Sequence, residues 1–275
     1  MRPLLRSLLF VPGARPDRFA GALSSGADGV IFDLEDSVDR SRKAEARAAV
    51  TAFLSQPPPT SAALFVRVNS VDSPWHGDDL DSFGRLQSIQ GIVLPKAEMP
   101  AQVAAVAQGL AAGRVIPLIE TARGVLNAPA IAAAEGSIPA VLFGAEDLTA
   151  QIGIPRTIDG DELVFARSQV VLAATSVGAD AIDAVFIDIT ALDDLRRDAL
   201  RARALGFRGK MAIHPGQIPV IHEVFSPSPS ERAHAQRIVD AFDRAQAQGE
   251  AVIRLDDRMV DMPVVVRAKR LLALP

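Results

Sequence analysis

The stretch Gly29-Val30-Ile31-Phe32-Asp33-Leu34-Glu35-Asp36 decides the fold, because a short apolar run passes directly into acidic residues. A run without polar alternation is typical of a parallel strand that is buried on both faces. Seven further runs along the chain share this composition. The eight candidate strands are Ser7–Val11, Gly29–Leu34, Ala63–Val68, Gly91–Leu94, Val115–Ile119, Ala140–Phe143, Ala181–Ile187 and Lys210–Ile213.

Helical patterns lie between these runs. They predict helices over Arg40–Leu54, with Ser41 as its cap, and over Pro100–Ala112, Asp161–Val177 and Ala191–Leu205. A (β/α)₈ barrel typically needs about 250 residues, and the chain has 275. A doubly wound sheet normally carries a glycine fingerprint, but no two glycines here stand two positions apart. The sequence therefore predicts an α/β fold, a (β/α)₈ TIM barrel over residues 1–225.

Residues 226–275 exceed what the barrel requires. Their pattern predicts a helix over Glu231–Gln248 capped by Ser230, a strand over Ala251–Leu255 and a final helix over Pro263–Leu274. A helical and hairpin extension of this length is too short to fold alone. We expect it to pack on its own barrel or on a neighbouring subunit.

Composition excludes several classes of protein. The 29 Lys and Arg residues against 33 Asp and Glu residues give a net charge of −4, which argues against a nucleic-acid partner. The absence of cysteine excludes disulfides, thiolate nucleophiles and cysteine-ligated metals, and favours a reducing cytoplasm. No stretch approaches the roughly 18–20 apolar residues of a membrane span.

Ionisable residues follow most of the apolar runs. In a TIM barrel the C-terminal ends of the strands form the active site. Charges buried at such ends are costly unless they are paired or bound to a metal. We therefore expect an active site there, the alternative being that these groups cap helices and pair with each other. The candidates are Glu35, Asp36, Arg67, Lys96, Glu120, Asp147, Asp188 and His214.

Glu120 and Asp147 form the most specific pair, because they follow two neighbouring strands. Two such carboxylates can share Mg²⁺, which takes few protein ligands and fills its shell with water and substrate oxygens. A helix cap by Asp147 and a salt bridge by Glu120 are the structural alternative. Arg67 can bind a substrate carboxylate through two parallel hydrogen bonds, or it can pair with Glu35 or Asp36. The same two roles are open to Lys96.

Several motifs resemble the citrate lyase β-subunit-like proteins of the HpcH/HpaI aldolase superfamily. They include Arg6–Gly13, Asp33–Val38, Arg67-Val68-Asn69, Phe143–Leu148 and Met259–Pro263. The resemblance implies a (β/α)₈ barrel assembled as a homotrimer or hexamer. It also implies a lyase that joins or splits a 2-oxo acid (oxaloacetate, pyruvate or glyoxylate) and an acyl-CoA or acyl-carrier-protein thioester.

The resemblance also implies roles for single residues. Glu120 and Asp147 match Mg²⁺ ligands, and Arg67 matches the residue that binds the substrate carboxylate, with Glu35 and Asp36 at its floor. Lys96 is grouped with these substrate-binding residues. Asp261 matches an aspartate that a C-terminal lid carries into a neighbouring subunit's site, where it is the candidate for proton transfer.

Two other activities stay open. One is an HpcH/HpaI-type class II aldolase that acts on free oxo acids without coenzyme A. Such enzymes usually carry a histidine near the second strand, where this chain has Asp33-Leu34-Glu35-Asp36. The other is a citrate lyase β subunit that works only in a complex with an acyl carrier protein.

Overall fold

The computed structural model describes residues 4–111, 114–134 and 139–274. The chain divides into two compact units, Met1–His222 and Glu223–Pro275. Across the described ranges, no helix has the length and apolar character that crossing a membrane requires.

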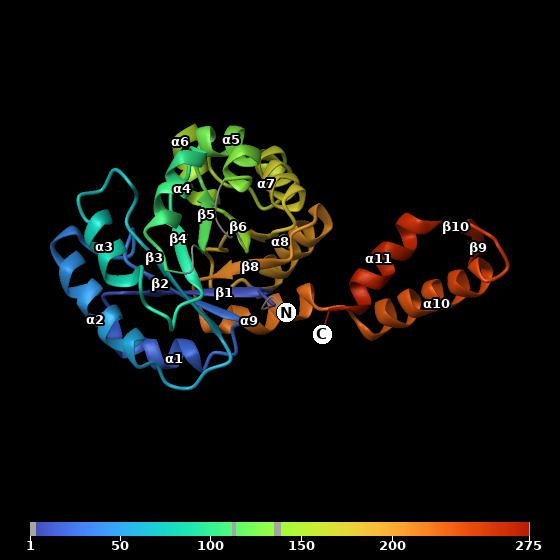
Figure 1. The fold of residues 1–275 in the computed structure, drawn as a ribbon, viewed down its shortest axis with the longest axis horizontal. Coiled ribbons are helices and arrows are strands. Elements are labelled where there is room, and N and C mark those ends of the chain that lie inside the picture. Colours follow the sequence, from blue (N-terminus) through green and yellow to red (C-terminus); the bar gives the residue numbers. More distant parts are fainter. Residues whose placement is uncertain (1–3, 112–113, 135–138, 275) are drawn as a thin grey trace. The chain divides into compact units, whose positions relative to one another are not determined.

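Eight parallel strands close into a barrel in the first unit, ordered as in the chain (Figure 1). The strands are β1 (Ser7–Pro12), β2 (Gly29–Asp33), β3 (Ala63–Arg67), β4 (Gly91–Leu94), β5 (Val115–Ile119), β6 (Ala140–Phe143), β7 (Asp180–Asp183) and β8 (Gly209–Ala212). The predicted (β/α)₈ barrel is therefore confirmed.

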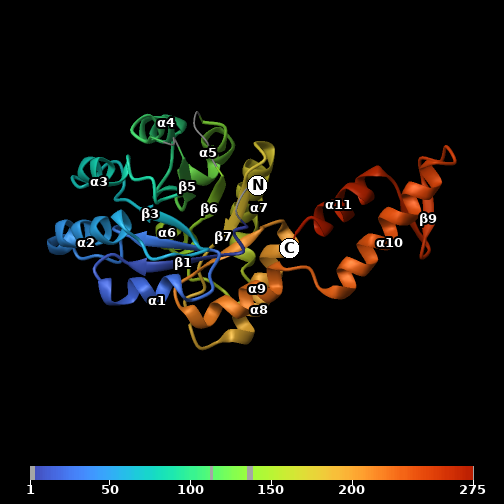
Figure 2. The ribbon, with the colours of Figure 1, turned by 60° about the horizontal axis from the view of Figure 1, so that its bottom comes forward.

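Helices follow the strands and surround the barrel, as the turned view in Figure 2 shows for α2, α3 and α4. The α-helices are α1 (Phe19–Leu23), α2 (Lys43–Ser55), α3 (His76–Phe83), α4 (Pro100–Gln108), α5 (Ala122–Ala132), α6 (Ala145–Ile152), α7 (Val164–Ser176), α8 (Leu192–Leu205) and α9 (Ile218–Phe225). Short 3₁₀ helices are η1 (Pro16–Arg18), η2 (Arg40–Arg42), η3 (Asp161–Leu163) and η4 (Pro215–Gln217). Ala112, the predicted end of one helix, lies outside the described residues.

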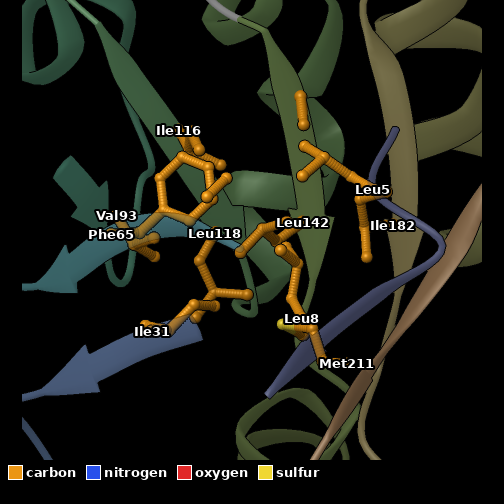
Figure 3. Close-up of a cluster of buried hydrophobic side chains, with 12 residues drawn as sticks. Leu5, Leu8, Ile31, Phe65, Val93, Ile116, Leu118, Leu142, Ile182 and Met211 are labelled. Atoms are coloured by element: carbon orange, nitrogen blue, oxygen red, sulfur yellow. The ribbon is translucent and has the colours of Figure 1, made fainter. Parts of the chain in front are cut away.

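Apolar side chains from all eight strands meet in one buried cluster (Figure 3). They take alternate strand positions, because successive side chains of a strand point to opposite faces. The intervening residues, such as Leu9 and Val30, are also buried, and they face the helices. Burial on both faces explains why the strand runs show no polar alternation. The cluster includes Leu8, Ile31, Phe65, Val93, Ile116, Leu118, Leu142, Ile182 and Met211.

The second unit consists of two helices joined by a β-hairpin. Its elements are α10 (Pro229–Gln246), β9 (Ile253–Leu255), β10 (Arg258–Val260) and α11 (Met262–Leu272). Asp256 and Asp257 form the hairpin turn with φ angles of 48° and 59°, as a two-residue turn of this twist requires. The predicted hairpin is present, although the sequence prediction gave a range only for its first strand. The unit has its own apolar cluster around Ile238, Phe242 and Val265.

Several boundaries differ from the sequence prediction. β7 ends at Asp183, not at Ile187, because its ladder with β6 stops at the pair Leu142–Ile182. Val185 lies beyond the ladder and still packs on the barrel cluster, so the apolar run outlasts the strand. An apolar run therefore marks the buried segment, and the strand can be shorter than the run.

Two predicted helix caps lie two residues too far along the chain. Asp39 caps the segment assigned to Ser41, and its Oδ1 accepts a hydrogen bond from the Ser41 N–H at 2.9 Å. Ser228 caps α10 in place of Ser230. Its hydroxyl accepts from the Glu231 N–H at 3.2 Å, and the Glu231 carboxylate accepts from the Ser228 N–H at 2.7 Å. This reciprocal pair is a capping box.

A buried ionic cluster lies between the strands β7 and β8 and the helices α7 and α8. Arg167 donates to both oxygens of Asp183, at 2.9 and 3.0 Å, and to Asp198 at 2.7 Å. Lys210 Nζ lies 2.6 Å from both Asp183 Oδ2 and Asp198 Oδ2. Burial alone would raise the pKa of Asp198, but the two cations outweigh burial and lower it. The charges of two carboxylates and two cations therefore balance each other in a buried region of the protein.

Replacing Lys210 with methionine should destabilise the barrel by about 3–5 kcal/mol, because two buried carboxylates then share one cation. The free energy of unfolding, measured by denaturant titration, tests this. Arg197→Met is the matched control, since Arg197 is exposed and pairs with Asp194 within one helix turn, which is worth at most about 1 kcal/mol. A loss for Lys210→Met no larger than the control's would contradict the assignment.

Candidate active site

A cavity of about 290 Å³ opens at the C-terminal ends of the barrel strands. Part of its lining is apolar and continues the barrel cluster through Phe10, Leu118, Val185 and Met211. The remainder is strongly charged. The charged lining residues are Arg18, Asp33, Asp36, Arg67, Glu120, Glu146 and Asp147.

Asp33 holds the Arg67 guanidinium. The two residues end β2 and β3 and lie opposite each other in the ladder. Arg67 Nε and Nη2 donate to the two oxygens of Asp33 at 2.6 and 2.7 Å, while Nη1 lies 3.0 Å from Glu35 Oε2. Burial would lower the pKa of Arg67, but Asp33 and Glu35 outweigh it and raise the pKa. Arg67 is therefore a fixed cation at the cavity.

Lys43 fixes the segment that carries Glu35. Its Nζ donates to the carbonyl oxygens of Leu34 and Glu35 at 2.7 and 2.6 Å. The same ammonium lies 5.5 Å from the centre of the Trp75 ring, within cation–π range. Burial lowers the pKa of Lys43. The backbone of this segment is thus tied to α2, while the Glu35 carboxylate pairs with other residues of the site.

Lys96 connects acidic residues from three strand ends. Its backbone has a φ of 50°, a left-handed conformation that is uncommon for a residue other than glycine. The Lys96 N–H donates to Glu120 Oε1 at 2.8 Å. The Lys96 ammonium donates to Glu35 Oε1 and lies 3.3 Å from Asp36 Oδ2 and 3.6 Å from Asp147 Oδ1. The Lys96 side chain therefore contacts three carboxylates from the ends of β2 and β6, and its backbone N–H binds a fourth from the end of β5.

Glu120 is 2% exposed and lies against the backbone of Gly144. A Cβ at position 144 would be 2.7 Å from Glu120 Oε2, so glycine is needed for this close approach. Burial, together with the nearby Glu35 and Asp147, raises the pKa of Glu120 to about 8 against the opposing effect of the cations Arg67 and Lys96. The metal-free site therefore disfavours the ionised form of Glu120.

Glu120 and Asp147 offer a fitting donor set for Mg²⁺. Asp147 lies in the first turn of α6, lines the same cavity and is 34% exposed. No group of three or more His, Cys, Asp or Glu side chains is arranged to hold a metal within the residues that the structure describes. Mg²⁺ does not require one, since it is often bound by one or two carboxylates. A divalent cation would also stabilise the ionised form of Glu120.

Three other residues named from the sequence have local roles. Asp188 lies in an exposed turn, where its Oδ1 accepts from the Thr190 N–H at 2.9 Å. His214 caps η4. Asp261 belongs to the second unit, where its carboxylate accepts from the Val264 N–H at 3.3 Å and caps α11.

Three charged residues that line the cavity had no role predicted from the sequence, namely Arg18, Asp33 and Glu146. For Asp33 and Arg67, opposite charges at the last positions of neighbouring strands were a usable signal. Arg156, which contacts Glu146 at 2.6 Å from a loop, is not part of the cavity lining and had no signal in the sequence.

Glu120→Gln should remove a pH-dependent loss of stability from the metal-free protein. An acid whose pKa is raised by folding stabilises the fold fully below its unfolded pKa, and this contribution disappears as the pH rises through the folded pKa, here about 8. The slope is at most about 1.4 kcal/mol per pH unit. Unfolding titrations in EDTA between about pH 5 and 9 test this, with the exposed Glu250→Gln as control. A glutamine variant with the wild-type pH dependence would contradict the prediction.

Comparison with known proteins identifies the family. The family model described as HpcH/HpaI aldolase/citrate lyase matches residues 6–215. A citrate lyase subunit beta-like protein of Deinococcus radiodurans is 41% identical over 98% of this chain and 97% of that protein. A mitochondrial citramalyl-CoA lyase of Rattus norvegicus is 32% identical over 98% and 85%. The crystal structure of CitE from Mycobacterium tuberculosis, in complex with magnesium, acetoacetate and coenzyme A, has a TM-score of 0.84 and 36% identity over 99% and 98%. These matches confirm the resemblance seen in the motifs, and the chain belongs to the HpcH/HpaI aldolase/citrate lyase family.

Proposed function

We propose that the chain is a magnesium-dependent carbon–carbon lyase that cleaves or forms the bond between a 2-oxo acid and an acyl-CoA thioester. The observation that carries this proposal is the cavity in which Glu120 and Asp147 lie beside Arg67. The rat relative is named citramalyl-CoA lyase, and the CitE structure contains magnesium and coenzyme A. The substrates are of the citryl-, malyl- or citramalyl-CoA type, with oxaloacetate, glyoxylate or pyruvate as the oxo acid.

Glu120 and Asp147 are the residues that would hold the magnesium ion. When bound there, the ion supplies positive charge for the substrate oxygens that become anionic. Arg67 binds the substrate carboxylate. A guanidinium has five N–H groups. Asp33 accepts from two of them and Glu35 lies beside Nη1, which leaves the remaining N–H groups for the substrate. Because Asp33 already fixes the guanidinium, substrate binding requires little further ordering of the Arg67 side chain. Glu35, Asp36 and Lys96 complete this side of the site.

The reaction needs a proton at the thioester side. In cleavage the substrate hydroxyl gives up its proton and the C–C bond breaks. The electron pair of that bond passes to the carbon next to the thioester carbonyl, which takes up a proton in place of the one released. We assign this proton transfer to Asp261 of a neighbouring copy, which residues 226–275 would deliver as a lid in a homotrimer or hexamer. The exposure of Met259 and Met262 in the second unit, 66% and 47%, supports a partner for it.

A second cavity gives room for the coenzyme A arm. Its volume is about 430 Å³, its lining includes His214, and it shares Phe10, Pro12, Arg18 and Ile213 with the first cavity. Arg18 offers a cation to a phosphate group there. Because the chain has no cysteine, which favours a reducing compartment, we place the reaction in the cytoplasm.

Asp147→Ala and Glu120→Ala should each lower Mg²⁺-dependent turnover by at least about 10²-fold, the usual cost of a lost electrostatic contact to the transition state. The assay follows thioester consumption for a panel of acyl-CoA substrates with glyoxylate, pyruvate and oxaloacetate, with Mg²⁺ or EDTA. Asp188→Ala is the matched control, because this acid lies in an exposed turn.

Near-normal turnover in EDTA by either variant would refute the metal assignment. If only thioesters on an acyl carrier protein react, and the carrier protein binds in a pull-down, the chain acts as a citrate lyase β subunit.

Arg67→Ala and Asp261→Ala should each be inactive, and a mixture of the two should regain part of the activity. A site shared between chains explains this, since a mixed oligomer contains sites with both residues intact. Activity is measured after subunit exchange has been verified by mass spectrometry. No recovery after complete exchange would count against the lid.

A further inference from the structure

We propose that Arg156 is a positioning residue of this site, which holds Glu146 and the end of β7 so that Asp147 faces Glu120. The inference rests on the proposed function and adds a residue that is not among the residues lining the cavity. Arg156 lies between α6 and η3, and its side chain is 15% exposed.

Arg156 joins two strand ends beyond their ladder. The pairing between β6 and β7 stops at Leu142 and Ile182. Past that point Arg156 Nη1 donates to Glu146 Oε1 at 2.6 Å and to the Val185 carbonyl oxygen at 2.9 Å. Glu146 and Val185 both line the cavity. One nitrogen therefore bridges two neighbouring parts of the cavity wall where backbone pairing has ended.

Arg156 is itself anchored to the buried ionic cluster. Its Nη2 lies 3.8 Å from Asp198 Oδ2, and Asp198 is held by Arg167 and Lys210. The guanidinium thus links the rim of the barrel to the charges beneath α7 and α8. A planar fork suits this task, because it offers several donors in a fixed geometry.

Glu146 and Asp147 are adjacent acids in the first turn of α6, and both line the cavity. Glu146 is 40% exposed, so without Arg156 its carboxylate would be a free competitor of Asp147 for a cation. Arg156 neutralises the charge of Glu146 and fixes the position of its carboxylate. Asp147 is then left as the acid of this turn that serves the site.

The test uses Mn²⁺ as a probe for the divalent ion, with binding followed by electron paramagnetic resonance of the free ion. Arg156→Met should weaken Mn²⁺ binding and lower kcat/KM by about 10–100-fold, the usual cost of losing a residue that orients a metal ligand. Loss of a positive charge alone would tighten cation binding, so weaker binding reports lost positioning. Arg156→Lys keeps the charge without the fork and should lie between wild type and Arg156→Met.

Two further variants complete the test. Arg201→Met removes an arginine that pairs with Asp161 away from the cavity. This variant should leave the Mn²⁺ affinity and kcat/KM unchanged. Arg156→Met combined with Glu146→Gln should be no worse than Arg156→Met alone, since residues acting through one contact are not additive. Faster amide exchange over residues 144–149 of the metal-free Arg156→Met protein would support the same conclusion.

Unchanged or tighter Mn²⁺ binding by Arg156→Met, or additive losses in the double variant, would overturn the role of Arg156. The two proposals are separable. A wild type that binds Mn²⁺ but cleaves no thioester refutes the lyase activity and leaves Arg156 to be judged by Mn²⁺ binding. A wild type that binds no Mn²⁺ refutes both.

Discussion

The burial of Glu120 beside other carboxylates is the constraint on which the site depends. A carboxylate that is 2% exposed loses its hydration, and its acidic neighbours increase the cost of ionisation. The surrounding contacts reduce this cost. Lys96 donates its backbone N–H to Glu120 and its ammonium to Glu35, while Arg67 is kept cationic by Asp33. Because ionisation of Glu120 stays unfavourable without a further positive charge, the cavity suits a divalent cation that would stabilise the carboxylate.

The barrel holds two ionic systems on different strands. One faces the cavity and includes Arg67, Lys96 and Glu120, and the other lies under the helices around Lys210. Arg156 is in contact with both through Glu146 and Asp198. The barrel therefore uses buried charge for two purposes, to fix the helices against β7 and β8 and to define the rim. Each purpose depends on compensation between opposite charges, because neither system is well hydrated.

The barrel was predictable because burial on both faces leaves a simple signature. The strands β4, β5 and β6 have the bounds predicted from their apolar runs. The position of site residues such as Glu120 and Asp147 followed from the rule that strand ends converge. The cap at Ser228 and the end of β7 did not follow, since they depend on local backbone geometry and on ladder pairing. The Asp33–Arg67 pair depends on strand register, and the Arg156 contacts depend on a loop path that no periodic pattern records.

Trp75 gives the protein an internal optical label. The chain has one tryptophan and no tyrosine, so its indole fluorescence originates from a single position. That indole lies over the Lys43 ammonium, whose hydrogen bonds hold the backbone at Leu34 and Glu35. A shift of this segment would alter the electric field at the ring, and with it the wavelength and intensity of the emission. Ligand titrations can thus be followed on the unmodified chain, without a dye or an engineered fluorophore.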